Sequence, residues 1–274
     1  MNAATPQKPL SFIRVVIENA GKCTVRGIEE VGYIFSLFIE SLFWILCGKR
    51  RQQPVRINSV FQEAMQIGVH AALISSLLCL AVGIMLAIQG IETLKIFGAE
   101  STVIVGIALS VTREFSPLII SILIAGRSGS AITARIGTMQ ESQEISALRV
   151  MGINPIRFLA APILIAMMVM VPVLTILGDF MGLLGGGIYT SLRLKMSLSS
   201  YMHRALDVLS VDDIRQGLIK SFVFAAIIAM VGISNGFQVR GGAEGVGRAT
   251  TGSVVMSISL IIISDMIFTF LLNR

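Results

Sequence analysis

Five ionisable residues stand inside long apolar runs of this sequence, where each charge needs a partner or a task. They are Arg113, Glu114, Asp179, Lys220 and Asp265. Such residues at membrane depth are costly and usually face a helix bundle's interior or a cavity. Two kinds of chemistry suit them: buried ion pairs that fix helix packing, or a polar patch in which Arg113 or Lys220 faces a lipid phosphate.

Arg113 and Glu114 are neighbours in the chain. On a helix they point about 100° apart, so they are poorly placed to pair with each other. We therefore expect each of them to find a different partner.

A charged, soluble-looking insert, residues 126–157, separates two of the apolar runs and is the stretch most suited to meeting a partner. Thr138 and Glu141 have capping-box spacing, which predicts the start of a helix there. Glu144 adds charge that favours the helix N-terminus, and Arg149 falls in the predicted last turn.

The predicted helix of the insert carries one short apolar stripe. Ile145, Leu148 and Met151 recur every three residues, and Gly152 and Pro155 then end the helix. The stripe needs something to pack against. Its own transmembrane helices, the membrane surface and a groove on a cytoplasmic partner would all serve, and the residues alone leave these alternatives open.

The elements that position these residues follow from composition. Hydrophobic residues make up 54% of the chain and charged residues 14%, with a mean hydropathy of +0.82, which is typical of a polytopic membrane protein. A helix needs about 20 apolar residues to cross a bilayer. Five runs satisfy this requirement and predict an all-α membrane domain with spans at 69–89, 102–125, 158–182, 217–237 and 253–272.

A sixth apolar run, residues 31–47, is short and carries Glu40 near its middle. An ionised group there would be costly in a span, so an in-plane elbow helix at the interface is favoured. A short amphipathic helix, residues 12–22, precedes it. The chain is thus divided into an N-terminal interfacial region, residues 1–57, and a transmembrane domain, residues 58–274, with its coupling segment at 126–157.

The basic residues predict orientation rather than nucleic-acid binding, although the net charge is +6. With a non-crossing elbow, most of them gather on one face, which the positive-inside rule makes cytoplasmic together with the N-terminus. Residues 92–100, residues 193–215 and the C-terminus then lie outside. Asp179 and Asp265 fall near the predicted outer span ends, where we expect them to reach interfacial water.

Three stretches carry a family resemblance. LSVTREFSPLIISILIAGRSGSAITARIGTMQESQEISALRVMGINPIRFL resembles the signature region of MlaE-type permeases, the membrane subunits of lipid-transporting ABC systems, and the likeness continues at DDIRQGLIKSFVF and GRATTGSVV. It runs from about Val69 to the C-terminus, with a weaker match through the elbow. The family often has Arg directly after Pro162, where this chain has Ile163, and this departure concerns only the start of that helix.

The resemblance implies a homodimer in a bacterial inner membrane, with a phospholipid pocket between the two copies. Each copy would present its insert helix to a cytoplasmic ATPase subunit, which binds ATP and Mg. A periplasmic MCE-type lipid-binding protein would sit on top, in a system that maintains outer-membrane lipid asymmetry. The implied sites are the coupling residues Thr138, Glu141, Glu144, Ile145, Leu148 and Met151, and the polar-core residues Arg113, Glu114, Lys220 and Arg248.

The chain itself shows no GxxxxGK[ST] phosphate loop, since the segment 242–248 has the glycine spacing but lacks the Lys and the hydroxyl. If ATP drives transport, another chain binds it. We expect no catalytic residue, metal site or cofactor in this chain, because neither HExxH nor GxSxG occurs and the cysteines fit no metal spacing.

Gly178, Gly182 and Gly186 repeat at intervals of four. Such a small-residue stripe lets two transmembrane helices approach closely. Whether this helix-packing seam lies within one subunit or between two is left open.

Two other functions remain as alternatives. A proton-coupled secondary transporter would use Asp179, Asp265 and Glu114 as proton carriers, although the chain is short for one and its spans show no evident inverted repeat. A membrane scaffold that transports nothing is the other. Dependence of lipid flux on ATP or on a proton gradient separates the first two, and any flux excludes the scaffold.

Overall fold

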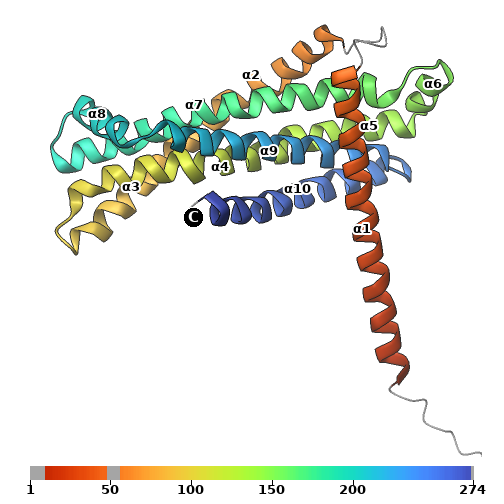
Figure 1. The fold of residues 1–274 in the computed structure, drawn as a ribbon, viewed down its shortest axis with the longest axis horizontal. Coiled ribbons are helices and arrows are strands. Elements are labelled where there is room, and N and C mark those ends of the chain that lie inside the picture. Colours follow the sequence, from red (N-terminus) through yellow and green to blue (C-terminus); the bar gives the residue numbers. More distant parts are fainter. Residues whose placement is uncertain (1–9, 48–55, 273–274) are drawn as a thin grey trace, which may run out of the picture.

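The computed structural model describes residues 10–47 and 56–272, and all regular structure in these ranges is helical (Figure 1). The α-helices follow one another along the chain with short connections. They are α1 (Leu10–Cys47), α2 (Ile57–Lys95), α3 (Val103–Ser110), α4 (Ser116–Ile124), α5 (Ser130–Glu141), α6 (Glu144–Val150), α7 (Ala161–Leu194), α8 (Leu198–Val208), α9 (Val211–Phe237) and α10 (Gly242–Leu272).

Five helical segments are long and apolar enough to cross a membrane, as predicted, and each contains one predicted span. The chain is a multi-pass membrane protein. The helices run beyond the predicted span ends because regular backbone continues past the most apolar window. The five are Ile57–Lys95, Glu100–Glu141, Ile156–Leu194, Val211–Phe237 and Gly242–Leu272.

The second and third of these segments are not uniform α-helices. Wider π-helical turns occur at η2 (Val111–Phe115), η3 (Ala125–Gly129) and η4 (Ile156–Ala160). Pro117 and Pro162 each follow such a turn by two residues. Proline lacks an N–H and crowds the preceding turn, and a local widening accommodates both effects.

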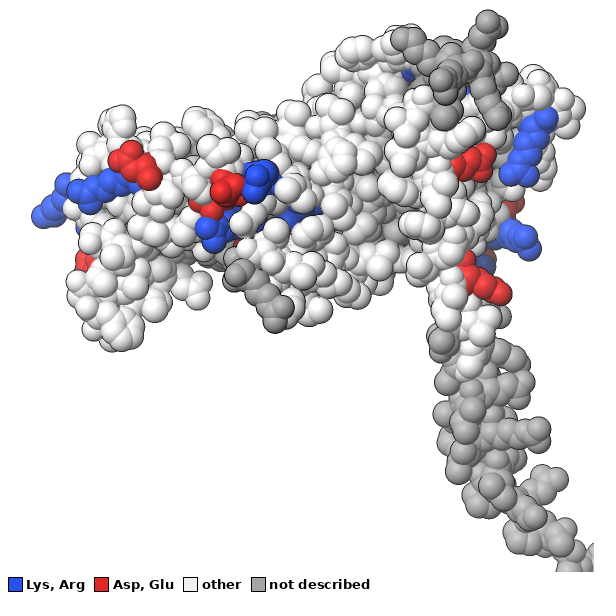
Figure 2. Space-filling model, in the orientation of Figure 1, with Lys and Arg blue, Asp and Glu red and all other residues white. Residues whose placement is uncertain are grey.

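The bundle has a central layer and an exposed periphery. In its most apolar stretch α9 is 67% buried, whereas the corresponding stretch of α10 is 11% buried and that of α2 is 28% buried. The long helices lie side by side, with α6 at one end of the bundle and α8 at the other (Figure 1). Figure 2 shows charged side chains at these two ends, a further charged group inward from the α8 end, and an uncharged stretch between that group and the α6 end, which suits an apolar bilayer core.

The N-terminal region differs from the prediction in one respect. The two predicted helices, 12–22 and 31–47, are one continuous helix, α1, because no Gly or Pro signal between them is strong enough to break it. Figure 1 shows α1 running across the long helices near the α6 end. It contacts α7, η4 and α9. This crosswise course fits an interfacial helix, and the interfacial position itself stays a prediction.

Candidate functional site

Arg113 pairs with a residue that the sequence analysis did not single out. Its Nε donates to Asp213 Oδ1 at 2.7 Å, and its Nη2 lies 2.5 Å from the same oxygen. Asp213 is 2% exposed and closes a capping box with Ser210, whose backbone N donates to Asp213 Oδ2 at 2.8 Å. The sequence signal that could have identified Asp213 is its capping-box spacing from Ser210, directly before an apolar run.

Glu114 belongs to a second cluster, which joins three helical segments. Lys220 of α9 forms an ion pair with Glu114 of η2 and lies 2.9 Å from Asp265 Oδ1 of α10. Its Nζ also donates to Thr269 Oγ1 at 2.9 Å, and Thr269 donates to Glu114 at 3.1 Å. The prediction of different partners for Arg113 and Glu114 is confirmed. Asp265 does not simply reach interfacial water as expected, because this cluster holds it.

The geometry distinguishes between the two chemistries considered for these charges. The Lys220 side chain is 2% exposed; its ammonium donates hydrogen bonds to Glu114 and Thr269 and is paired by charge with Asp265, whose Oδ1 lies 2.9 Å away without forming a hydrogen bond. In the described part of the chain Lys220 thus acts as the centre of an ion-pair network. Arg113 and Glu114 differ from it, since their side chains are 34% and 32% exposed. Any polar ligand would meet these two first.

Arg248 does not join this cluster. It lies near the start of α10, pairs with Glu244 at 3.5 Å and has a side chain that is 73% exposed. Asp265 lies 17 residues further along the helix, about 25 Å at 1.5 Å per residue. The four residues grouped by family resemblance therefore occupy two separate places in one subunit.

Asp179 is also placed differently from the prediction. It was expected near an outer span end, but α7 continues to Leu194 and puts Asp179 near the helix middle. Its Oδ1 is buried and has no hydrogen-bond partner among the described residues. An unpaired carboxylate oxygen at this depth is unusual.

The insert begins as a continuation of the second span. Thr138 and Glu141 lie in the last turns of α5, so the prediction that they start a helix is wrong. The Thr138 hydroxyl donates to Ala134 O at 2.8 Å instead of capping free N–H groups. The chain turns at Gln143, which has a φ of 63°, and α6 starts at Glu144. Capping-box spacing does not mark a helix start when the turns before it are themselves helical.

The apolar stripe of α6 is divided between the protein interior and its surface. Ile145 is 1% exposed and belongs to the main core cluster, and Leu148 is partly buried. Met151 is 64% exposed, and Val150, which the sequence analysis missed, is 89% exposed. One end of the stripe thus packs on the bundle, and the other end offers an apolar tip.

The predicted helix stop is confirmed. Gly152 adopts a φ of +75°, which a residue with a side chain rarely takes, and its N–H bonds to Arg149 O at 3.0 Å. Ile153 N donates to Leu148 O at 2.9 Å. These bonds close the end of α6 and fix where the apolar tip points.

The glycine stripe packs within this chain. A Cβ at Gly178 would approach Ile120 Cδ1 to 2.6 Å, and one at Gly182 would approach Val111 Cγ1 to 2.7 Å. At Gly186 the nearest atoms, at 2.9 Å, belong to Ile107 and Tyr201. The stripe is therefore an intramolecular seam.

Comparison with known proteins identifies the chain's relatives. The family described as Permease MlaE matches residues 60–271. A probable ABC transporter permease protein of Rickettsia typhi is 32% identical over 93% of this chain and 96% of its own length. A second, from Synechocystis, is 35% identical over 83% and 85% of the two chains.

A third relative has a more specific name. The intermembrane phospholipid transport system permease protein MlaE of Haemophilus influenzae is 33% identical to this chain, over 83% of this chain and 87% of its own length. The family match covers most of the membrane bundle, including both halves of the ion-pair network and the insert. The chain therefore belongs to the MlaE family of ABC transporter permeases.

Proposed function

We propose that this chain is the permease subunit of an ABC transporter that moves phospholipid between the bacterial inner membrane and an extracytoplasmic MCE-type lipid carrier. Such transport would help to maintain outer-membrane lipid asymmetry. The name of the Haemophilus relative supports phospholipid as the substrate. The observation that carries the proposal is the exposed apolar tip of α6, Val150 and Met151, at one end of the membrane bundle.

The α6 tip suits docking to a cytoplasmic ATPase subunit, which would bind ATP and Mg. Val150 and Met151 supply apolar contact area, and Glu144 is exposed on the same short helix. Ile145 holds the other side of α6 in the main core cluster. A force on the tip would therefore move packed side chains of the bundle rather than a free loop.

The second span connects this docking site with the ion-pair network. One helical segment, Glu100–Glu141, carries Arg113 and Glu114 in η2 and ends directly before α6. Movement of α6 would thus act on the helix whose charges bind α9 and α10. In this proposal the ion-pair network keeps η2, α9 and α10 in contact while the lipid cavity changes width.

A homodimer would supply the second wall of that cavity. The most apolar stretch of α10 is only 11% buried in one copy, although it is long enough to span the bilayer. Glu114, which accepts a hydrogen bond from Thr269 of α10, and its chain neighbour Arg113 remain about one-third exposed. A second copy facing α10 would enclose an apolar space with these two polar groups at its edge. Exposed apolar residues of α10 include Val255, Ile262, Ile263, Met266, Ile267 and Phe270.

One observation favours the alternative of a proton-coupled secondary transporter. Asp179 combines a mid-helix position with an unpartnered buried oxygen, which is a common setting for a proton-carrying carboxyl group. An unpartnered buried oxygen also occurs where packing is imperfect. Proton-coupled transport does not explain the exposed α6 tip. We therefore rank this function second.

A transport assay separates the two functions. The tagged chain would be purified from its native membrane with its associated proteins and reconstituted with fluorescent phospholipid in liposomes. We expect lipid transfer that requires ATP with Mg and that a protonophore leaves unchanged. Transfer that persists without ATP and stops with the protonophore would overturn the ABC function. An Asp179→Asn variant then shows whether that residue carries the proton.

A further inference from the structure

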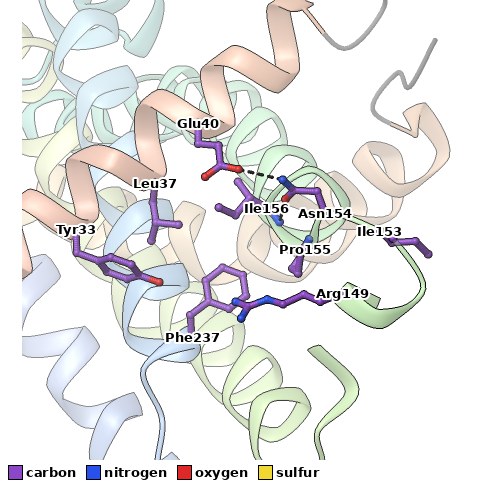
Figure 3. Close-up of a pocket in the computed structure, with 10 residues that line it drawn as sticks. Tyr33, Leu37, Glu40, Arg149, Ile153, Asn154, Pro155, Ile156 and Phe237 are labelled. Carbon is purple, nitrogen blue, oxygen red and sulfur yellow. Dashed lines mark hydrogen bonds between the residues drawn. The ribbon is translucent and has the colours of Figure 1, made fainter. Parts of the chain in front are cut away.

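A pocket of about 430 Å³ lies where α1 meets the connection between α6 and α7 and the end of α9. Figure 3 shows its lining side chains, which come from all of these segments. Small-molecule sites commonly measure about 300–1,000 Å³. The pocket is separate from the ion-pair network, whose residues do not line it.

Two opposite charges line the pocket. Glu40 extends from α1, and Arg149 extends from the last turn of α6, with Leu37 and Phe237 nearby (Figure 3). Among the described residues no carboxylate lies within ion-pair distance of Arg149. Both charges are therefore available to a ligand that carries a negative and a positive group.

The Glu40 side of the pocket is held in place. Asn154 Nδ2 donates to Glu40 Oε1 at 3.0 Å. Asn154 Oδ1 in turn accepts from Ile156 N at 2.8 Å, so the amide's orientation is fixed by the backbone at the start of η4. The carboxylate keeps a second oxygen for a cation.

Tyr33 adds a hydroxyl to the same pocket. Partial burial raises the pKa of the Tyr33 phenol above its ordinary value, with 38% of the residue still exposed; Arg149 opposes this shift and Glu40 adds to it. The phenol is therefore neutral and can donate a hydrogen bond to an anion. With the Arg149 guanidinium it forms the donor side of the pocket.

The surroundings of the pocket indicate where such a ligand would come from. From Val25 onward, α1 exposes apolar side chains. The Arg157 guanidinium carbon lies 5.6 Å from the centre of the Trp44 ring. Exposed apolar groups next to aromatic and basic ones are typical of the lipid headgroup region. The exposed apolar residues of α1 include Val25, Ile28, Val31, Phe35, Ile39 and Leu46.

We propose that this pocket binds the phosphoethanolamine group of a membrane phospholipid, with the phosphate at Arg149 and Tyr33 and the ammonium at Glu40. A guanidinium and a phenol hydroxyl suit a phosphate, and a carboxylate suits an ammonium that donates hydrogen bonds. The bound lipid would connect α1 with the helix that carries the α6 tip. This site goes beyond the proposed transport function and does not depend on it.

The test compares lipid retention by variants of the full chain. Each protein is equilibrated in detergent micelles with equal amounts of phosphatidylethanolamine and phosphatidylglycerol, and bound lipid is counted by native mass spectrometry. We expect the parent to retain phosphatidylethanolamine preferentially. Arg149→Gln should reduce the lipid that the parent retains at this pocket about tenfold for both headgroups, while lipid in the proposed transport cavity stays bound, since a charge-assisted hydrogen bond contributes roughly the equivalent of one decade or more in affinity.

Glu40→Gln gives a different expected result. Glutamine still accepts the hydrogen bond from Asn154, so the pocket keeps its shape and loses only a charge. Preference for phosphatidylethanolamine should disappear while phosphatidylglycerol stays bound. Matched controls are Glu29→Gln on the same helix and Arg240→Ala, both at exposed positions that do not line this pocket, and both should behave like the parent.

Two further experiments control for misfolding of the variants and identify the source of the ligand. Arg149→Lys keeps the charge and should restore part of the retention, which excludes simple misfolding of Arg149→Gln. Soluble phosphoethanolamine should compete only weakly with the lipid, because it lacks the acyl chains. Equal retention of the two lipids by the parent, or parent-like retention in both Arg149→Gln and Glu40→Gln, would overturn the proposal. Full competition at low concentration would assign the site to a soluble solute.

Discussion

The two ends of the membrane bundle satisfy their polar and apolar groups in different ways. Toward the α8 end, Lys220 is surrounded by oxygen atoms of its own chain, and Arg113 is paired with a capped Asp213. Toward the α6 end, Val150 and Met151 are exposed and Arg149 faces a pocket. The charges named in the first region are paired within one chain, whereas the charge and the apolar tip of the second are left for a partner to cover.

This difference shows which kinds of residue in the sequence are the better candidates for contacts with partners. Intramembrane charges are the conspicuous feature of the sequence, yet most of them are used to join helices. The exposed tip of α6 consists of two ordinary apolar residues. In this protein the residues available for partners are less unusual in sequence than the residues that hold the bundle together.

Removal of Lys220 should have the largest effect on stability. Lys220→Ala leaves Glu114 and Asp265 close together without a cation, so we expect a loss of about 3–5 kcal/mol in the free energy of unfolding. Unfolding by SDS in mixed micelles measures it. Lys220→Met combined with Glu114→Gln and Asp265→Asn should recover most of the loss. A single Lys220→Ala variant with parent-like stability would show that the network is not structural.

The close seam between α2 and α7 gives the next largest effect. A Cβ at Gly83 would overlap the Gly182 carbonyl oxygen, which is backbone and has little room to move. We expect Gly83→Ala to cost about 1–3 kcal/mol, the usual range for overpacking. Gly106→Ala is the matched control, because nothing lies within 4 Å of a Cβ there. Equal melting temperatures for the two variants would contradict the seam.

Asp179 should give the smallest effect if the charges of the bundle are structural. Its buried Oδ1 has no partner and costs free energy, so replacement by a neutral amide in Asp179→Asn should leave stability unchanged or raise it by up to about 1 kcal/mol, with ATP-dependent lipid transfer at the parental rate. The reconstituted transfer assay checks this. A variant that folds normally and no longer transfers lipid would move Asp179 into the transport mechanism.

Some of this architecture could be predicted from the sequence. Hydropathy located the five spans because about 20 consecutive apolar residues rarely occur outside transmembrane helices. The adjacency of Arg113 and Glu114 correctly predicted separate partners, and Gly152 correctly marked the end of α6. Each of these features depends on residues that are close together in the chain.

The errors concern features that depend on distant contacts or on backbone continuity. Thr138 and Glu141 have capping-box spacing, but an unbroken helix runs through them. Asp179 was predicted near a span end because the apolar window stops before α7 does. No local pattern shows that Arg113 meets Asp213, 100 residues later, and this pairing follows only from how the helices pack.

The exposed α6 tip is the proposed docking site for an ATPase subunit. The most direct measurement is affinity purification from the native membrane, comparing the parent with a Val150→Asp, Met151→Asp double variant by quantitative mass spectrometry. Ile96→Asp with Phe97→Asp is the matched control, since this apolar pair is 81% and 76% exposed and follows the end of α2.

We expect the tip variant to lose its co-purifying ATPase tenfold or more, because two apolar side chains would contribute roughly 1.5–3 kcal/mol each on burial. The control variant should retain the ATPase. Equal recovery of the ATPase by the tip variant and the parent would contradict the docking role of α6.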